Sequence, residues 1–356
     1  MHGNNLKEDI MKEFRFGIAG AGVIAHMFAD GLSVLPGAVL AGVASNTPGR
    51  AESFANEYRH LYPDAAAYDS YEAMALDPTI DAVYVANLNP QHKDAAILFL
   101  THKKPVLCEK PFALNAKETR EMIKCAKDND TFLMEAMWTR YQPVTRKIMA
   151  WIEAGKIGDI VSVRSEFGME LMSSADRRVV AIEKGGGALL DLGIYPISYL
   201  SMLFRQSPSA YRTIVSKAVT GVDASFEAIF QYGELERPFS KIPQTAHITV
   251  AMDRSLEKSM EITGTKGMIH VHHFWAADSA SLNTLSPTGE GYDTPAEVYS
   301  PEWIPTGYQY EAKEVMDLVT AGKKESSVMP LSETLSLMET LDAIRNDWGL
   351  IYPQEQ

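Results

Sequence analysis

Short apolar segments alternate with helical patterns between residues 14 and 135, and this alternation constrains the fold more than any other feature of the sequence. The segments have strand length and are rich in Val, Ile and Ala, which is typical of strands that crossover helices cover on both faces. They span residues 14–20, 39–45, 80–87, 105–109 and 131–135. We expect helices at residues 91–101 and after Asn115, which can cap a helix with Glu118 three residues further on. The pattern predicts an α/β fold whose N-terminal part is a doubly wound parallel sheet.

The second half of the chain has a different pattern. Residues 264–267, Gly-Thr-Lys-Gly, are typical of a hairpin turn. Apolar residues at helical spacing predict helices near residues 143–155, 310–321 and 332–348. Five segments alternate polar and apolar residues or are rich in β-branched residues: 158–168, 226–232, 245–252, 258–264 and 267–273. We therefore expect a second α/β domain with a large open, mainly antiparallel sheet.

Charge and cysteine content exclude several classes of protein. The 46 acidic and 33 basic residues give a net charge of −13, and no basic block offsets it, so we expect no nucleic-acid partner. Cys108 and Cys125 are too few for a disulfide scaffold, a four-cysteine zinc site or an iron–sulfur cluster held by this chain alone. Two cysteines in a chain of this length favour the reducing cytoplasm.

Two further segments bear on a membrane or secretory role. The N-terminal residues lack the apolar core of a secretory signal, and residues 1–11 have the mixed charge of a loose tail. The apolar stretch 188–204 is interrupted by Asp191, Gly193 and Pro196, and we regard it as too short and too broken to span a bilayer. We expect a soluble protein that does not bind membranes.

The first predicted strand runs directly into a glycine-rich turn, and a helical pattern follows the turn. Gly20 allows the tight turn, Gly22 lets a pyrophosphate approach the backbone, and the small Ala25 lets helix and strand pack closely. Val23 and Ile24 belong to the first helical turn, whose N-terminus faces the anion. The alternative is a glycine-rich connection without a ligand. The strand–turn–helix context favours a dinucleotide site.

The end of the second strand bears on the choice of cofactor. An NAD enzyme normally presents Asp or Glu there to the ribose hydroxyls, but this chain has Ser45 and Asn46. Arg50 follows shortly and can bind a 2′-phosphate, unless it is an ordinary solvated residue of the next helix. We expect NADP as the cofactor, with NAD as the alternative.

Two further strand ends face the ligand crevice of such a sheet. One strand leads to Asn87, Pro90 and His92, and the next leads to Glu109 and Lys110. An ammonium group at this place stabilises a developing alkoxide or shifts the pKa of a neighbour. The alternatives are a solvated loop lysine and a histidine that merely begins a helix.

An acid and a phenol lie four residues apart in the apolar segment 185–195. Helical spacing puts Asp191 and Tyr195 on one face, although Gly193 and Pro196 predict a kink. The alternatives are a helix cap or internal salt bridge for Asp191 and a core position for Tyr195.

We predict no function for two other groups of residues, a histidine cluster and a lysine pair. His270 and His272 share one face of a strand with His273 beside them, and we reject a metal site because no third ligand is nearby at zinc-like spacing. We interpret Lys103 and Lys104 as a solvated pair.

With residues 20–25 (GAGVIA), 89–92 (NPQH), 108–111 (CEKP) and 185–195 (GGGALLDLGIY) in this order, the chain resembles the glucose-fructose oxidoreductase and inositol dehydrogenase family, GFO/IDH/MocA. Within it, the chain is most similar to the dimeric dihydrodiol dehydrogenase branch, which also oxidises D-xylose with NADP. The resemblance implies a Rossmann domain, a second domain with a large open sheet, and a nicotinamide cofactor between them.

The resemblance also implies roles for single residues. It places Lys110 close to the nicotinamide and the reacting carbon, with Asp191 and Tyr195 at the acid and acid/base positions. It places Trp138 and Phe167 in the wall of the substrate pocket. That branch has an Arg where this chain has Ser45, which leaves Arg50 as the guanidinium nearest the ribose.

These observations give one expected layout and function. We expect a tail at 1–11, a Rossmann domain at 12–136, a substrate and dimerisation domain at 137–330, and a C-terminal helix and tail at 331–356. The expected activity is hydride transfer between NAD(P) and a hydroxyl-bearing carbon of a sugar, cyclic polyol or trans-dihydrodiol. The rivals are an NAD-dependent glycosidase-type enzyme on the same fold and a cofactor-bound sensor or co-repressor.

Two physical expectations accompany this function. Lys110 and the cationic nicotinamide should favour the phenolate of Tyr195, which then takes the proton of the substrate hydroxyl. The open sheet should have an apolar outer face through which two copies form a homodimer.

Overall fold

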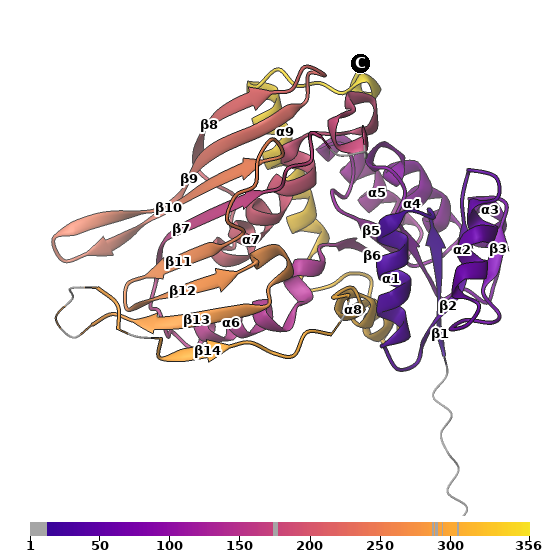
Figure 1. Cartoon of the computed structure of the whole chain (residues 1–356), viewed down its shortest axis with the longest axis horizontal. Coiled ribbons are helices and arrows are strands. Elements are labelled where there is room, and N and C mark those ends of the chain that lie inside the picture. Colours follow the sequence, from indigo (N-terminus) through magenta and orange to yellow (C-terminus); the bar gives the residue numbers. More distant parts are fainter. Residues whose placement is uncertain (1–12, 174–176, 287, 289–290, 294, 305) are drawn as a thin grey trace, which may run out of the picture.

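The computed structural model describes residues 13–173, 177–286, 288, 291–293, 295–304 and 306–356 (Figure 1). Its first part is a six-stranded sheet, sheet A, with the order β3-β2-β1-β4-β5-β6 and parallel pairing throughout. The strands are β1 (Phe14–Ala19), β2 (Ala38–Ala44), β3 (Ala66–Tyr68), β4 (Ala82–Val85), β5 (Val106–Glu109) and β6 (Leu133–Ala136). The helices are α1 (Val23–Ser33), α2 (Arg50–Tyr58), α3 (Tyr71–Ala75), α4 (His92–Thr101) and α5 (Ala116–Asp128). The predicted doubly wound sheet is confirmed, and the predicted tail at 1–11 lies outside the described residues.

Two details of sheet A refine the expectation. Strand β3 has only three residues, none of them fully buried, so it leaves no apolar segment in the sequence. The predicted cap of α5 is present, because Asn115 accepts a hydrogen bond from the backbone N–H of Glu118 at 2.9 Å. The Glu118 carboxylate accepts from the N–H of Leu114 at 3.0 Å, one residue further back than a standard capping box requires.

The second part contains an eight-stranded sheet, sheet B, with the order β14-β13-β12-β11-β7-β10-β9-β8. All neighbours are antiparallel except β7 and β10, which run parallel, so the predicted mainly antiparallel sheet is confirmed. The strands are β7 (Ile160–Gly168), β8 (Ala210–Lys217), β9 (Asp223–Arg237), β10 (Ser240–Ala251), β11 (Met260–Gly264), β12 (Gly267–His272), β13 (Ser279–Thr284) and β14 (Glu297–Tyr299). Strands β8, β13 and β14 were not predicted, because they lie toward the edges of the sheet and bury little apolar surface.

Helices cover one face of sheet B and connect it to sheet A (Figure 1). Helices α6 (Pro143–Glu153), α7 (Ile194–Phe204) and α9 (Leu331–Asp347) pack on this covered side. Helix α9 also contacts α5 and β6, and α8 (Gln309–Thr320) contacts α1, so the last two helices join the two sheets. Many buried side chains of both parts consequently belong to one apolar cluster, and a second cluster lies around β4, α4 and α5 of the first part.

The predicted apolar outer face of sheet B is wrong. Alternation along each strand turns the apolar side chains toward the helices and leaves mostly polar side chains on the other face. Ile214 and Ile229 are exposed there, but they lie among charged and polar groups. Those groups include Arg164, Glu227, His247 and Glu261.

Two other expectations are corrected by burial. Lys104 is not solvated, because its ammonium is buried and donates hydrogen bonds to the carbonyl oxygens of Asp77 and Ile80. The segment Ile182–Phe204 is long and apolar enough to cross a membrane by length and composition, contrary to our expectation. Since 78% of its most apolar window is buried inside the protein, the segment serves here as a core helix.

Candidate active site

The glycine turn after β1 has the shape of an anion site at a helix N-terminus. Gly20 has a φ of +109°, and a Cβ on it would lie 2.8 Å from the backbone of residues 86 and 87, so only glycine fits. A Cβ on Gly22 would meet nothing within 4 Å, which leaves open space above the backbone. No side chain caps α1, and Val23 in its first turn is 77% exposed. The turn therefore offers uncapped N–H groups and free space to a pyrophosphate.

The other residues of the predicted turn hold α1 and the glycine turn against the sheet. Ala25 is fully buried where α1 packs on the sheet, and Ile24 is partly buried against the core. The N–H of Gly20 donates to the carbonyl oxygen of Ala44 at 2.9 Å, which brings the turn next to the end of β2.

The end of β2 presents hydroxyl, amide and guanidinium groups, and no carboxylate. Ser45 follows β2 directly, and its Oγ accepts a hydrogen bond from the N–H of Thr47 at 3.2 Å. Asn46 and Arg50 are exposed, and Arg50 begins α2 after Gly49, which has a left-handed φ of +77°. The residues that face the adenosine ribose in this fold are therefore uncharged or cationic.

His92 holds the two crevice loops together. It begins α4 and is 1% exposed, with Nδ1 2.9 Å from the carbonyl oxygen of Pro111 and Nε2 3.1 Å from that of Asn87. Burial lowers its pKa to about 4. A neutral histidine with both ring nitrogens on backbone oxygens is a poor proton acceptor for a substrate. Pro90 lies in the 3-10 turn that leads into this helix.

Glu109 and Lys110 at the end of β5 point to different places. The Glu109 carboxylate is buried, accepts a short hydrogen bond from Tyr84 and accepts the N–H of Lys110 at 3.0 Å. Burial is the main reason that the pKa of Glu109 rises, to about 6. The Lys110 side chain instead reaches across to the second part of the chain.

Lys110, Asp191 and Tyr195 meet in one group. The Lys110 Nζ donates to the backbone oxygen of Asp191 at 2.9 Å and lies 3.6 Å from its carboxylate. The same ammonium lies 4.6 Å from the centre of the Tyr195 ring. The Asp191 carboxylate also lies 3.5 Å from the Arg178 guanidinium, so it sits between two cations.

The local backbone explains how Asp191 and Tyr195 come together. A π-helical turn, Leu189–Gly193, lies where the kink was predicted and runs into α7. Gly187 precedes this turn with a φ of +125°, and a Cβ there would lie 2.2 Å from the Asp223 carboxylate. That carboxylate accepts the N–H of Leu189 at 2.6 Å and thereby anchors the start of the turn.

Charge and burial oppose each other at Tyr195. Burial raises the pKa of Tyr195 and outweighs the lowering effect of Lys110, so the expected phenolate is wrong for the chain without cofactor. Burial alone would lower the pKa of Lys110, but Tyr195, Asp191 and Glu109 raise it overall. The group therefore contains a neutral phenol beside an ammonium.

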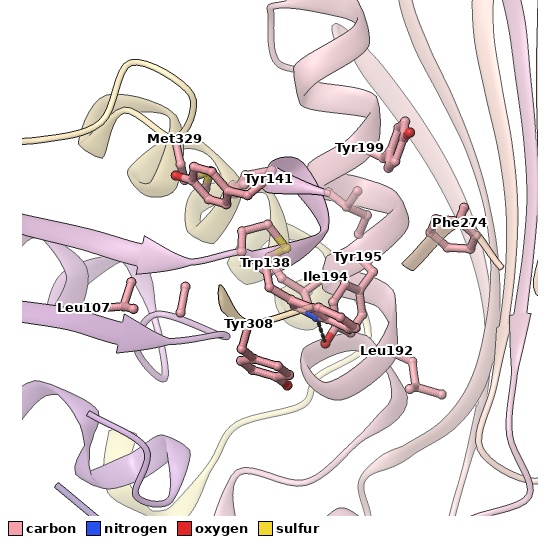
Figure 2. Packing of buried hydrophobic residues seen from close by; sticks show 14 of the residues in the cluster. Leu107, Trp138, Tyr141, Leu192, Ile194, Tyr195, Tyr199, Phe274, Tyr308 and Met329 are labelled. Carbon is pink, nitrogen blue, oxygen red and sulfur yellow. Dashed lines mark hydrogen bonds between the residues drawn. The ribbon is translucent and has the colours of Figure 1, made fainter. Parts of the chain in front are cut away.

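Trp138, Phe167, Trp275 and Tyr308 form an aromatic wall near the phenol of Tyr195, and Figure 2 shows Trp138 and Tyr308 beside it. The indole N–H of Trp138 donates to the Tyr195 oxygen at 3.1 Å, and the Trp138 ring stacks on Tyr308 with centroids 4.9 Å apart. Phe167 meets the Tyr195 ring edge to face at 5.8 Å and stacks on Trp275 at 4.9 Å.

Sequence reasoning missed three of these neighbours. Arg178 lies in the loop 171–184, which has no periodic pattern, and Tyr308 lies in an irregular segment before α8. Trp275 lies in a 3-10 turn, Phe274–Ala276, between β12 and β13. The sequence offered one signal for Trp275, because an aromatic residue there closely follows the predicted strand 267–273.

The histidine cluster differs from the expectation. His272 meets His273, the next residue along the chain, with ring centroids 3.9 Å apart. The premise that no third ligand is near is wrong, because the Asp278 carboxylate lies 2.8 Å from Nδ1 of His272 and 3.0 Å from Nδ1 of His273.

Comparison with known families identifies the class of protein. Residues 14–137 match the family described as "Oxidoreductase family, NAD-binding Rossmann fold". Residues 145–270 match the "GFO/IDH/MocA C-terminal domain". The chain therefore belongs to the GFO/IDH/MocA family of oxidoreductases, as the sequence motifs predicted, and is an NAD(P)-dependent dehydrogenase.

Individual proteins that are similar to this chain include dihydrodiol dehydrogenases and a sugar oxidoreductase. The chain is 36% identical to trans-1,2-dihydrobenzene-1,2-diol dehydrogenase of Mus musculus over 350 residues, which is 96% of this chain and 99% of the mouse protein. Identity and coverage are the same for the Homo sapiens enzyme of that name. The fold resembles the crystal structure of aldose-aldose oxidoreductase from Caulobacter crescentus with a TM-score of 0.79 at 19% identity, covering 94% of this chain and 97% of that one.

Proposed function

We propose that this enzyme prefers NADP and oxidises a hydroxyl-bearing carbon of a trans-dihydrodiol, with cyclic polyols and sugars as the alternative substrates. One observation carries the proposal: Lys110, Asp191 and Tyr195 converge beside the strand ends where a dinucleotide lies in this fold. A binding module without catalysis has no need for an ammonium and a buried phenol at this point. A glycosidase-type or sensor function is accordingly not favoured.

The residues present fit the cofactor. The open space at Gly22 and the uncapped start of α1 suit the pyrophosphate. Ser45, Asn46 and Arg50 suit an anionic 2′-phosphate better than a bare ribose, because they offer donors and a positive charge. When bound, the nicotinamide supplies the hydride acceptor.

The protein's own groups handle the proton and the developing charge. Tyr195, as a neutral phenol, donates to the substrate oxygen in reduction and must lose its proton to act as the base in oxidation. Lys110 stabilises negative charge on that oxygen. Asp191 holds the ammonium in place through its backbone oxygen and its carboxylate, and Arg178 holds the carboxylate.

The aromatic wall favours a flat ring as substrate. Trp138, Phe167, Trp275 and Tyr308 present aromatic faces and edges around the phenol. Such a wall packs against an unsaturated six-membered ring better than against a fully hydroxylated sugar, which needs hydrogen-bond partners on every side. The 36% identical relatives carry the name of an enzyme for such a diol.

A substrate panel tests the proposal. Trans-dihydrodiols, inositols and aldoses are each incubated with NADP⁺ or NAD⁺, and the reduced nicotinamide is followed by absorbance. We expect the highest kcat/KM for a trans-dihydrodiol with NADP⁺. Cofactor that stays tightly bound and shows no net reduction with any substrate would point to the glycosidase-type function.

We further propose a cytoplasmic homodimer that pairs through the open face of sheet B. Among the described residues no helix packs on this face, and its charges alternate, with Arg164 opposite Glu261 and His247 beside Glu227. Complementary charges favour pairing of two such faces about a twofold axis. Light scattering that finds only a 39.3 kDa species at micromolar concentration would contradict the dimer.

A further inference from the structure

Two histidines and an aspartate form a compact group outside the candidate active site. His272 ends β12, His273 follows it, and Asp278 directly precedes β13. The antiparallel register pairs His272 with Ser279, which returns Asp278 to the same place. The carboxylate oxygens lie 2.8 Å and 3.0 Å from the Nδ1 atoms of His272 and His273.

The backbone holds this group in a costly conformation. His273 has a φ of 46°, in the left-handed region that a residue other than glycine rarely adopts. This conformation keeps both adjacent rings on the Asp278 side instead of on opposite faces of the strand. The Ser279 hydroxyl donates to the same carboxylate at 3.2 Å. Strained, well-anchored residues of this kind concentrate at binding sites.

We propose that His272, His273 and Asp278 bind a divalent transition metal ion, with zinc as the probe. Two imidazole nitrogens and a carboxylate oxygen are a common protein ligand set for zinc. Tetrahedral coordination at about 2.0–2.1 Å separates the ligand atoms by about 3.3 Å. The observed separations of 2.8 Å and 3.0 Å need only a small outward movement, and all three ligand atoms lie within 4.8 Å of one another.

The chemistry of the three ligands determines which metal ion fits, and their solvent exposure determines how the ion reaches them. Imidazole nitrogens disfavour magnesium and calcium, which take oxygen ligands. The three side chains are 49%, 42% and 41% exposed, so an ion reaches them from solvent and retains water at its remaining position. Hydrogen bonding without an ion is the alternative that the experiment must exclude.

Ring contacts connect this proposed metal site to the aromatic wall around Tyr195. The His273 ring lies 5.4 Å from the Trp275 ring, edge to face. Trp275 in turn stacks on Phe167, which meets Tyr195. A metal ion on His273 therefore fixes the turn that carries Trp275, and the Trp275 fluorescence should report its binding.

Zinc affinity is measured on the full chain without an affinity tag, by competition with a chromophoric chelator. We expect one zinc per chain, bound at least roughly tenfold more weakly by His273→Gln and by Asp278→Asn, since even loss of an outer-shell partner costs ten- to hundredfold. His247→Gln is the control, because His247 is an exposed histidine of β10 that faces Glu227 at 4.0 Å. Circular dichroism verifies that each variant is folded.

Two results would overturn the proposal. Zinc binding to the wild type that is no tighter than to the His273→Gln variant would show that the group is only hydrogen-bonded, or that zinc binds elsewhere. Zinc that changes the fluorescence of the wild type and of a Trp275→Phe variant equally would refute the link to the aromatic wall.

Discussion

The indole N–H of Trp138 donates a hydrogen bond to the phenol oxygen of Tyr195 at 3.1 Å (Figure 2). Because this bond uses a lone pair of the oxygen, the phenol hydrogen remains available to a substrate. The Lys110 ammonium lies over the ring of the same tyrosine, so the phenol proton of Tyr195 and the positive charge of Lys110 are close to one another.

Removal of the phenol should abolish most of the activity. Tyr195→Phe is expected to lower kcat by roughly a hundredfold or more, the usual contribution of a general acid or base. NADP⁺ binding, measured by fluorescence titration, should stay nearly unchanged. Tyr199→Phe is the matched control, since Tyr199 is buried one turn further along α7 and lies outside the site. Near-normal turnover in Tyr195→Phe would make Tyr195 a core residue.

The pH dependence should follow the raised pKa of Tyr195. Burial holds the phenol protonated at neutral pH, so kcat/KM for oxidation should rise with pH and keep rising beyond about 10, the ordinary phenol value. The reduction rate should stay level over the same range, because the phenol is the proton donor. Tyr195→Phe should lose the slope. A plateau in the wild type above pH 7 would instead show that the phenol is not the base.

Lys110 and Tyr195 should act as one unit. Lys110→Met is expected to lower kcat by roughly a hundredfold or more, since an ammonium at a developing alkoxide contributes in the transition state. The double variant Lys110→Met/Tyr195→Phe should be little worse than either single variant, because each residue depends on the other. Losses of kcat that multiply fully would show that the two groups act independently.

Arg50 should discriminate between the cofactors. Arg50→Ala is expected to weaken NADP⁺ binding about tenfold or more while NAD⁺ binding changes little, because a charge-assisted bond to phosphate contributes about 1.5 to 3 kcal/mol. Dissociation constants for both cofactors test this. Arg59→Ala at the other end of α2 is the control. Equal losses for both cofactors would refute a contact between Arg50 and the 2′-phosphate.

The sequence predicted the site residues that directly follow the strands of sheet A. Gly20 and Gly22 directly follow one strand, and Lys110 directly follows another. Because the carboxyl ends of parallel strands lie at the same edge of a sheet, these residues were expected to face one crevice. Arg178, Trp275 and Asp278 were not predicted, because irregular turns without a periodic pattern place them beside their partners. The raised pKa of Tyr195 in the chain without cofactor was not foreseen, since the charge of Lys110, which lowers this pKa, is visible in the sequence whereas the depth of burial is a property of the whole fold.

Transfer of a labelled hydride tests the central claim most directly. A trans-dihydrodiol carrying deuterium on its hydroxyl-bearing carbon is oxidised with NADP⁺, and the mass of the reduced cofactor is measured for the wild type and for Lys110→Met. We predict that the wild type forms NADPH that contains the deuterium, at a rate roughly a hundredfold or more above that of the variant. Reduced cofactor without deuterium, or equal label transfer by both proteins, would contradict a dehydrogenase that works through Lys110.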